Sequence, residues 1–371
     1  MSALDTLLGV YAGRPAAPRP ADAPVPVIGH VGADVPVELI TAAGALPLRL
    51  SGGPGEDTAD GDRYLGRGVD PAARSTLTRL LAGRWGRLDG LVVARDCEAS
   101  LRLFYALREL RRTEPATALP PVHLADVLHL PHRTTTRYDL RRLRELRDRL
   151  ATWTGGPIGD DALAAAVAAH DESRRLLAAA AAELRRRSPA RVTGREWLAI
   201  VGAGTVLPVH AYNGLLERLL AEAAELPRHD GVRVFMTGSG HDSPEVYERV
   251  ESTGRVIVGE DHDWGDLLFE RRVGGRTPEA LAERYQYNGP TAPRASIRAR
   301  ARYTAMAVER CGAEELVSCC REHDEAAAWD FPAQREAAGV PSVLVERQPY
   351  GAIDTSAFET SAFRSARTGG R

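Results

Sequence analysis

The chain has 371 residues, of which 48 are basic and 50 are acidic, so its formal net charge at pH 7 is −2. This length suits two domains of ordinary size, and the near balance of charge disfavours a protein that binds nucleic acid through a strongly basic surface. Every one of the 48 basic residues is arginine. The absence of lysine excludes Schiff-base catalysis, a pyridoxal-phosphate lysine and the lysine of a phosphate-binding P-loop.

Nothing in the sequence indicates export or insertion into a membrane. It contains no run of 18 apolar residues, and its first residues lack the basic flank and apolar core of a signal peptide. Four cysteines are too few for a disulfide framework. We therefore expect a cytoplasmic protein that does not contact a membrane.

Short apolar segments alternate with helical segments in the first third of the chain. The expected strands are residues 25–29, 45–50, 88–94 and 121–124. The expected helices are residues 36–43, 71–81 and 98–112, and the Gly- and Asp-rich residues 51–62 are expected to form a loop. Strands that alternate with helices are typical of a parallel sheet covered by helices on both faces.

The middle of the chain is helical, and the last third repeats the pattern of the first. The expected central helices are residues 134–150, 160–187, 194–203 and 207–226. In the last third we expect strands at residues 232–236, 255–258, 315–319 and 341–345, and helices at residues 244–252, 295–309 and 326–338. An Asp- and Gly-rich loop is expected between the second of these strands and the helix that starts at residue 295.

The predicted fold class is therefore α/β, with two Rossmann-like (flavodoxin-like) parallel-sheet domains and a helical layer between them. The expected division is an N-terminal α/β domain over residues 1–150, a helical segment over 151–228 and a C-terminal α/β domain over 229–371.

Ligands of open parallel sheets bind beyond the carboxyl ends of the strands. In the first half, these positions carry His30 after the first strand and Cys97 after the third. In the second half, they carry residues 237–241, and Cys319 and Cys320 followed by residues 323–325. We expect a cleft between the two halves to gather these four loops.

The cysteines differ in what their positions predict. Cys97 follows an apolar strand and precedes a helix, where the helix N-terminus and Arg95 favour a thiolate; a small residue buried at a strand end is the alternative. Cys319 and Cys320 are adjacent, so at most one of them faces the cleft easily. Cys311 is expected in the core. No two cysteines have the spacing of a local metal-binding motif.

Histidines and a glycine-rich turn also lie on strand-end loops. One of His30, His241 and His323 is a candidate proton donor or acceptor near neutral pH, although a histidine with only structural bonds is the commoner case for any one of them. Gly238-Ser239-Gly240 precedes a helix and resembles a phosphate cradle, but the full dinucleotide-binding fingerprint is absent.

Four segments, taken in order, resemble the 2-hydroxyacyl-CoA dehydratase and benzoyl-CoA reductase subunit family. They are residues 36–45 (PVELITAAGA), Asp96-Cys97-Glu98, Thr237-Gly238-Ser239 followed by residues 254–261, and Trp329-Asp330-Phe331-Pro332 followed by Gly339-Val340-Pro341. The similarity covers roughly residues 25–355, and it implies two Rossmann-like domains.

The resemblance also implies a chemistry. Each subunit of that family typically holds a 4Fe-4S cluster through three separated cysteines, pairs with a homologous second subunit as a heterodimer, and depends on an ATP-dependent activator protein that supplies a low-potential electron. The implied activity is one-electron (ketyl radical) chemistry on an acyl-CoA thioester, as a lyase or as a component of an acyl-CoA reductase. One-electron reduction of the thioester carbonyl makes a weakly acidic proton removable. A cluster iron with an open position can also bind the substrate oxygen as a Lewis acid.

The sequence departs from the family pattern at two of the three cysteines. Cys97 matches the first ligand. The second is expected within residues 287–292, which contain no cysteine, and the third aligns with Asp324. Cys319 and Cys320 lie four or five residues upstream of Asp324 and would replace it as ligands only if the loop were rebuilt.

The resemblance assigns expected roles to particular residues. The two candidate catalytic residues are His30 and Glu38. His30 would approach the substrate carbonyl or hydroxyl, and Glu38 would support the start of the adjoining helix. Cys97, with Cys319 and Cys320, would be the metal ligands. The expected substrate-binding residues are Gly238, Ser239, His241 and Asp324.

Three functions remain open on the sequence alone. The first is a dehydratase or reductase component that binds acyl-CoA and a cluster with atypical ligands. The second is a cluster-poor, non-catalytic partner subunit that completes or stabilises a cluster-bearing paralogue. The third is a homologue repurposed for acyl-CoA chemistry without redox steps.

Overall fold

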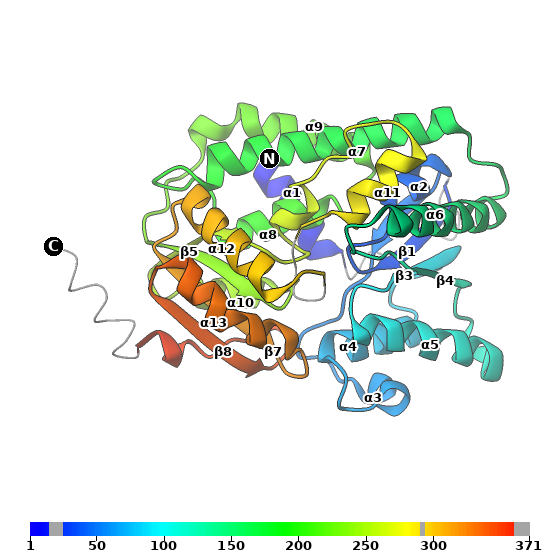
Figure 1. Ribbon diagram of the computed structural model, residues 1–371, viewed down its shortest axis with the longest axis horizontal. Helices are drawn as coiled ribbons and strands as arrows, with labels where there is room; N and C mark the ends of the chain where they lie inside the picture. The colour runs from blue at the N-terminus through cyan, green and yellow to red at the C-terminus, as the bar shows by residue number, and fades with distance from the viewer. Residues whose placement is uncertain (15–24, 290–293, 360–371) are drawn as a thin grey trace.

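The computed structural model describes residues 1–14, 25–289 and 294–359. It contains two parallel four-stranded sheets connected by helices (Figure 1). No helix within these ranges is both long enough and apolar enough to cross a lipid bilayer. The predicted α/β fold class with two parallel sheets is therefore confirmed.

The N-terminal sheet has the strand order β2-β1-β3-β4. Its strands are β1 (Val27–Val31), β2 (Leu46–Arg49), β3 (Gly90–Ala94) and β4 (Val122–Ala125). One face packs against α4 (Pro71–Leu81) and α5 (Glu98–Thr113), and the other packs against α2 (Val37–Ala42) and α6 (Arg133–Thr154). The apolar stripes of these helices and the buried strand residues make one core on each face, as expected for a doubly wound sheet.

The C-terminal sheet repeats this topology with the order β6-β5-β7-β8. Its strands are β5 (Val232–Gly238), β6 (Arg255–Glu260), β7 (Glu315–Arg321) and β8 (Ser342–Gln348). Helix α10 (Pro244–Glu251) covers one face, while α12 (Ile297–Cys311) and α13 (Ala326–Ala338) cover the other. In each sheet, the connections run outward in opposite directions from the two central strands, which are β1 and β3 in one sheet and β5 and β7 in the other. In open parallel sheets, ligands bind at the carboxyl ends of such central strands.

Further helices lie across one side of both sheets (Figure 1). They are α7 (Asp160–Ala180), which continues into a π-helical turn (Ala181–Arg185), α8 (Gly194–Ala203) and α9 (Val209–Ala221). The first helix of the chain, α1 (Ala3–Gly13), packs with them around a core that contains Leu7, Trp197 and Leu216. The start of the chain therefore contributes to the helical layer.

Two segments that the sequence suggested were loops contain helices. Helix α3 (Ala59–Leu65) begins within the Gly- and Asp-rich stretch, and Asp62 on it pairs with Arg74 of α4 at 2.5 Å. Helix α11 (Pro278–Gln286) lies between β6 and α12. The Thr277 hydroxyl caps this helix and proline occupies its first position, a start signal that the surrounding Gly- and Arg-rich residues obscured.

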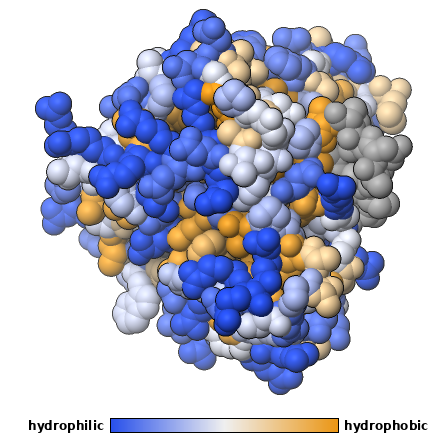
Figure 2. Space-filling model, turned by 90° about the vertical axis from the view of Figure 1, so that its right-hand side faces the viewer, coloured by the Kyte–Doolittle hydropathy of each residue, from blue (hydrophilic) through white to orange (hydrophobic). Residues whose placement is uncertain are grey.

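Helix α11 belongs to the last third of the sequence, yet it packs in the N-terminal half of the molecule. Its buried residues Leu281, Ala282 and Tyr285 join the core formed by α2, α6 and the N-terminal sheet. Figure 1 shows α11 beside α6 and α2. The side of the molecule formed by this half presents a mostly polar surface around a band of apolar surface (Figure 2).

Candidate functional site

A cleft lies between the carboxyl ends of the two sheets. It has about 1530 Å³ of space, part of it open to solvent, and loops after six strands line it. Its walls include Gly32, Arg49 and Cys97 from the N-terminal half. The C-terminal half contributes residues 238–240, 261–264 and 323–327. Cys97 and the turn that leads to Trp329 thus face the same crevice.

Cys97 is the N-cap residue of α5. The backbone N–H of Ser100 donates to its Sγ at 3.4 Å, and the Ser100 hydroxyl lies 3.2 Å from the same sulfur. The side chain reaches the solvent of the cleft, but the surrounding walls and the neighbouring Asp96 carboxylate raise the pKa of the thiol. The thiol is therefore neutral at pH 7, because these effects outweigh the helix N-terminus that favoured a thiolate.

The other cysteines do not line this cleft. Strand β7 extends to Arg321, so Cys319 and Cys320 lie inside the sheet, where Cys319 is part of an apolar core and Cys320 faces the opposite side near the Ser318 hydroxyl. Cys311, the last residue of α12, is buried in the core, as predicted. Within the described ranges, no three His, Cys, Asp or Glu side chains gather as a metal site. This donor set does not fit a cluster held by three thiolates of this chain.

The glycine-rich turn after β5 is bonded internally. Gly238 has φ of +115°, and a Cβ atom there would lie 2.3 Å from the Cys319 carbonyl oxygen, so only glycine fits. The Ser239 N–H donates to that carbonyl oxygen at 2.9 Å. The Ser239 hydroxyl donates to Asp324 at 2.5 Å and accepts the Arg321 N–H at 2.9 Å. The turn therefore orients Asp324 at the cleft, and both the N–H and the hydroxyl of Ser239 are bonded within the protein.

His241 lies below the cleft, while its neighbours Gly240 and Asp242 line it. The His241 ring is 3% exposed, its Nε2 lies 3.3 Å from the Cys319 carbonyl oxygen, and it packs edge-on against His262. Burial and the nearby Arg321 lower the pKa of His241 well below its usual value. A neutral histidine in these contacts contributes to packing beneath the site.

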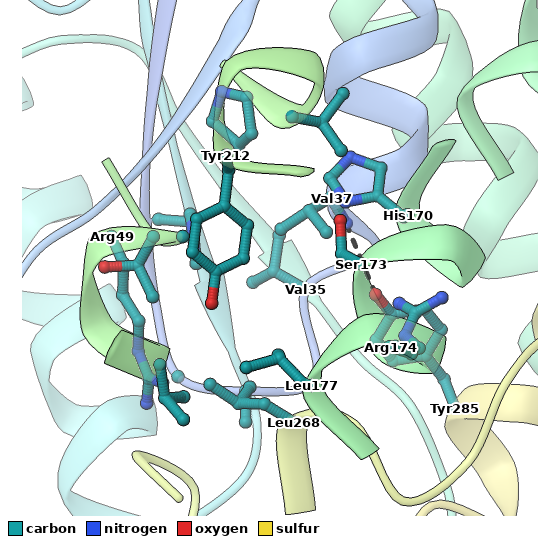
Figure 3. A pocket seen from close by; sticks show the side chains of 18 of the residues that line it. Val35, Val37, Arg49, His170, Ser173, Arg174, Leu177, Tyr212, Leu268 and Tyr285 are labelled. Atoms are coloured by element: carbon teal, nitrogen blue, oxygen red, sulfur yellow. Dashed lines mark hydrogen bonds between the residues drawn. The ribbon is translucent and has the colours of Figure 1, made fainter. Parts of the chain in front are cut away.

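A second cavity, which we call the inner chamber, lies behind the cleft. It has about 760 Å³ of space, part of it open to solvent, and its walls come from β1, β2, α7, the segment between α8 and α9, and α11. Gly32 and Arg49 line both the inner chamber and the cleft, so the two spaces share a wall. Figure 3 shows aliphatic side chains in its middle, with Arg49 on one side and Arg174 and Tyr285 on the other.

His30 lines the inner chamber from the end of β1. It is 5% exposed, and its Nδ1 has no hydrogen-bond partner in the described part of the chain. Burial and the positive charge of Arg49 lower the pKa of His30 to about 3. The ring is therefore neutral and can exchange a hydrogen bond with an occupant, but it does not hold an ionisable proton near neutral pH.

Glu38 lies behind the wall of the inner chamber and does not line it. It forms an ion pair with Arg174 and accepts a hydrogen bond from the Tyr285 hydroxyl at 2.8 Å. Burial alone would raise the pKa of Glu38, but Arg174 and other cations lower it to about 2. Glu38 is thus an ionised positioning residue that fixes two side chains of the chamber wall.

Asp96 belongs to the segment Asp96-Cys97-Glu98 that resembles the family, but the sequence analysis assigned it no role. Its Oδ2 accepts the Ala33 N–H at 3.1 Å and packs against Gly32, while its Oδ1 has no partner within the described residues. Burial and the nearby Asp34 raise the pKa of Asp96 to about 6. A carboxyl group that titrates near neutral pH in a cleft is a candidate for proton transfer. The sequence could have identified Asp96 as a candidate, because it lies beside Cys97 after a central strand of the sheet.

Arg294 also lines the cleft, and the sequence did not single it out. Its side chain is 4% exposed and pairs with Asp34 at 2.8 Å, while its Nε and Nη1 have no hydrogen-bond partner among the described residues. It follows the segment in which the resemblance placed the second cysteine, of which residues 290–292 lie outside the described ranges. Its proximity to Asp34 depends on the tertiary fold, so the sequence offered no signal for it.

Two comparisons agree on the family. The family model of the 2-hydroxyglutaryl-CoA dehydratase D-component matches residues 33–357. A benzoyl-CoA reductase subunit of Thauera aromatica is 30% identical over 255 residues, which make up 66% of this chain and 63% of that relative. The chain thus aligns with less than two thirds of the relative's length. Because the family model matches most of the chain, this protein belongs to the 2-hydroxyglutaryl-CoA dehydratase D-component family.

Proposed function

We propose that this chain is a subunit of a 2-hydroxyacyl-CoA dehydratase-like or benzoyl-CoA reductase-like system that acts on an acyl-CoA thioester by one-electron chemistry. The family and the similarity to a reductase subunit support this class of activity. In this proposal the chain works with a homologous second subunit and an ATP-dependent activator protein, and the active complex carries a 4Fe-4S cluster.

The contribution of this chain is that of a cluster-poor partner subunit. One observation carries this part of the proposal: among the four cysteines, Cys97 alone faces the cleft. One thiol does not replace three, and carboxylate or imidazole groups are unusual ligands for an iron–sulfur cluster. We therefore assign the cluster to the homologous subunit. The roles that we propose for residues of this chain do not involve the cluster.

The residues of this chain would handle the acyl group. The cleft and the inner chamber share Arg49 and Gly32, His30 offers a neutral ring with an unused nitrogen, and Asp96 offers a carboxyl group that titrates near pH 6. Such groups bind a thioester oxygen and move a proton without themselves being redox-active.

The test is the iron and acid-labile sulfide content of anaerobically purified protein, with an electron paramagnetic resonance spectrum. We expect the chain alone to contain little iron and the complex with its homologous subunit to contain a full cluster. A full cluster on the chain alone would contradict the partner role.

A second candidate is that Cys97 ligates iron in the assembled complex. Its position at the cleft, beside the helix N-terminus of α5, favours this candidate. The variant Cys97→Ser distinguishes the two candidate functions. The iron content of the complex falls if Cys97 is an iron ligand, and it stays unchanged if this chain holds no iron.

A further inference from the structure

His129 connects segments that are far apart in the sequence. It lies between β4 and α6, and its side chain is 13% exposed. Its Nε2 lies 3.0 Å from Oδ2 of Asp34, in the loop after β1. Its Nδ1 lies 3.2 Å from the backbone carbonyl oxygen of Gln286, the last residue of α11. Because this loop and α11 both line the inner chamber, the ring joins two walls of that cavity.

Both contacts of the ring are with hydrogen-bond acceptors. A backbone carbonyl oxygen only accepts hydrogen bonds, and an ionised carboxylate does the same. A neutral imidazole has one N–H to donate, whereas the two acceptors require two. The geometry therefore fits the imidazolium form of His129, with a proton on each ring nitrogen.

The Asp34 carboxyl group is ionised in this arrangement. It pairs with Arg294 at 2.8 Å, and Arg284 of α11 is a further cation near it. Burial alone would raise the pKa of Asp34, but Arg294 and His129 lower it below its usual value. Asp34 is therefore an acceptor at neutral pH and supplies no proton to the ring.

Two other carboxyl groups near this contact titrate near neutral pH. Burial raises the pKa of Asp139, on α6, to about 6, and this group interacts with His129. Burial also raises the pKa of Asp96 to about 6, and Asp96 interacts with Asp34. A test of His129 must therefore separate its charge from those of Asp96 and Asp139.

Loss of one ring proton would break the bond to α11. A hydrogen bond to an ionised group is about twice as strong as one between neutral groups, so the remaining proton stays on Nε2, facing Asp34. The Nδ1 lone pair then faces the Gln286 carbonyl oxygen. The Gln286 side chain keeps its bonds to the Leu130 carbonyl oxygen and the Thr136 hydroxyl, so the end of α11 loosens but stays attached.

We propose that His129 is a pH-dependent latch between α11 and the loop after β1. When the ring is protonated, it holds both walls of the inner chamber; when it is neutral, the last turn of α11, which carries Arg284 and Tyr285, loosens. Histidine is the side chain that ordinarily changes its charge between about pH 5 and 8. The inference concerns the wall of the chamber and not its ligand, so it is independent of the proposed function.

The test is hydrogen–deuterium exchange of the full chain, without ligand, at about pH 5.5 and about pH 8.5. Exchange rates are divided by those of unstructured peptides at the same pH, and α10 on the C-terminal sheet is the internal reference. We expect the amides of α11 to exchange at least about tenfold faster at the higher pH relative to α10, because a hydrogen bond to a charged group is worth that factor or more. Equal protection of α11 at both pH values would overturn the proposal.

The variant His129→Gln cannot become charged, so its α11 amides should exchange rapidly at both pH values. His132→Gln, at the exposed N-cap of α6, is the matched control and should keep the response of the unmodified chain. Asp96→Asn and Asp139→Asn should keep it as well. Loss of the response in either of these two variants, or its persistence in His129→Gln, would assign it to another group and overturn the proposal.

A second measurement does not depend on the folding of a variant. In nitrogen-15 spectra of the unmodified chain with labelled histidine, both ring nitrogens of His129 should be protonated at about pH 5.5, and Nδ1 should have lost its proton at about pH 8.5. Proximity to Gln286 in nuclear Overhauser spectra identifies the ring. A single protonated nitrogen at the lower pH, or two at the higher pH, would contradict the latch.

Discussion

The two sheets have the same strand order, but their carboxyl edges differ in how their polar groups are used. At the N-terminal sheet, His30 Nδ1, Arg49 Nε and Asp96 Oδ1 have no hydrogen-bond partners in the part of the chain that the structure describes. At the C-terminal sheet, the Ser239 hydroxyl bonds Asp324 and the Arg321 N–H. At the C-terminal edge, Asp261 Oδ1 is also without a partner among the described residues. The N-terminal edge therefore has more unpartnered polar atoms available to a ligand, while the bonds of Ser239 stabilise the C-terminal edge.

The largest expected effect is on the stability of the C-terminal half. Arg185 and Glu260 form a fully buried ion pair, so Glu260→Ala leaves a guanidinium partly uncompensated. We expect the free energy of unfolding to fall by about 3–5 kcal/mol in chemical denaturation. The control Glu248→Ala removes an exposed pair with Arg195 and should cost less than about 1 kcal/mol. Similar losses in both variants would mean that the buried pair is not structural.

At the N-terminal edge, we expect a substitution of Asp96 to change how the free energy of unfolding depends on pH, without weakening the fold. The folded-state pKa of Asp96 is raised to about 6, so the folded state binds its proton more tightly than the unfolded chain does. Asp96 should therefore favour folding below about pH 4, and that contribution should be lost as the pH rises through about 6, by up to about 3 kcal/mol.

The variant Asp96→Asn should remove this pH dependence and raise stability at pH 7, as measured by denaturation between pH 4 and 8. The exposed Asp148 supplies the control Asp148→Asn, which should leave the profile unchanged. An unchanged profile for Asp96→Asn would show that this carboxyl group titrates as in the unfolded chain.

The smallest effect concerns the thiols of the two edges. Cys97 reaches solvent, whereas Cys319 and Cys320 are buried in β7. In the native protein we expect iodoacetamide to modify Cys97 first, and slowly below about pH 9 because its pKa is raised; Cys319 should react only after denaturation. Mass spectrometry of the alkylated peptides measures this, and early modification of Cys319 would show that the C-terminal edge opens readily.

The sequence predicted the strands and the fold class well, because apolar runs and helix stop signals are local. The eight expected strands are those of the two sheets, and the helices at residues 71–81, 194–203 and 326–338 have the expected bounds. The expectation that ligands bind beyond the carboxyl ends of parallel strands also singled out Cys97, His30 and Asp324, which line the two cavities.

The contacts between distant segments were beyond sequence reasoning. The ion pairs of Arg49 with Asp263 and of Arg294 with Asp34 join residues more than two hundred positions apart, and no local pattern encodes them. Helix α11 was missed because its short apolar face lies in a Gly- and Arg-rich segment. Because α11 was missed, the sequence analysis also gave no reason to place Arg284 and Tyr285 in the wall of the inner chamber.

The position of α11 has a consequence for the order in which the inner chamber is completed. The strands of the N-terminal sheet are synthesised long before residues 278–286, yet these late residues supply a wall of the inner chamber. A fragment that ends before α11 would contain the first sheet without the α11 wall of the chamber. The inner chamber is therefore complete only after the last third of the polypeptide has docked onto the first.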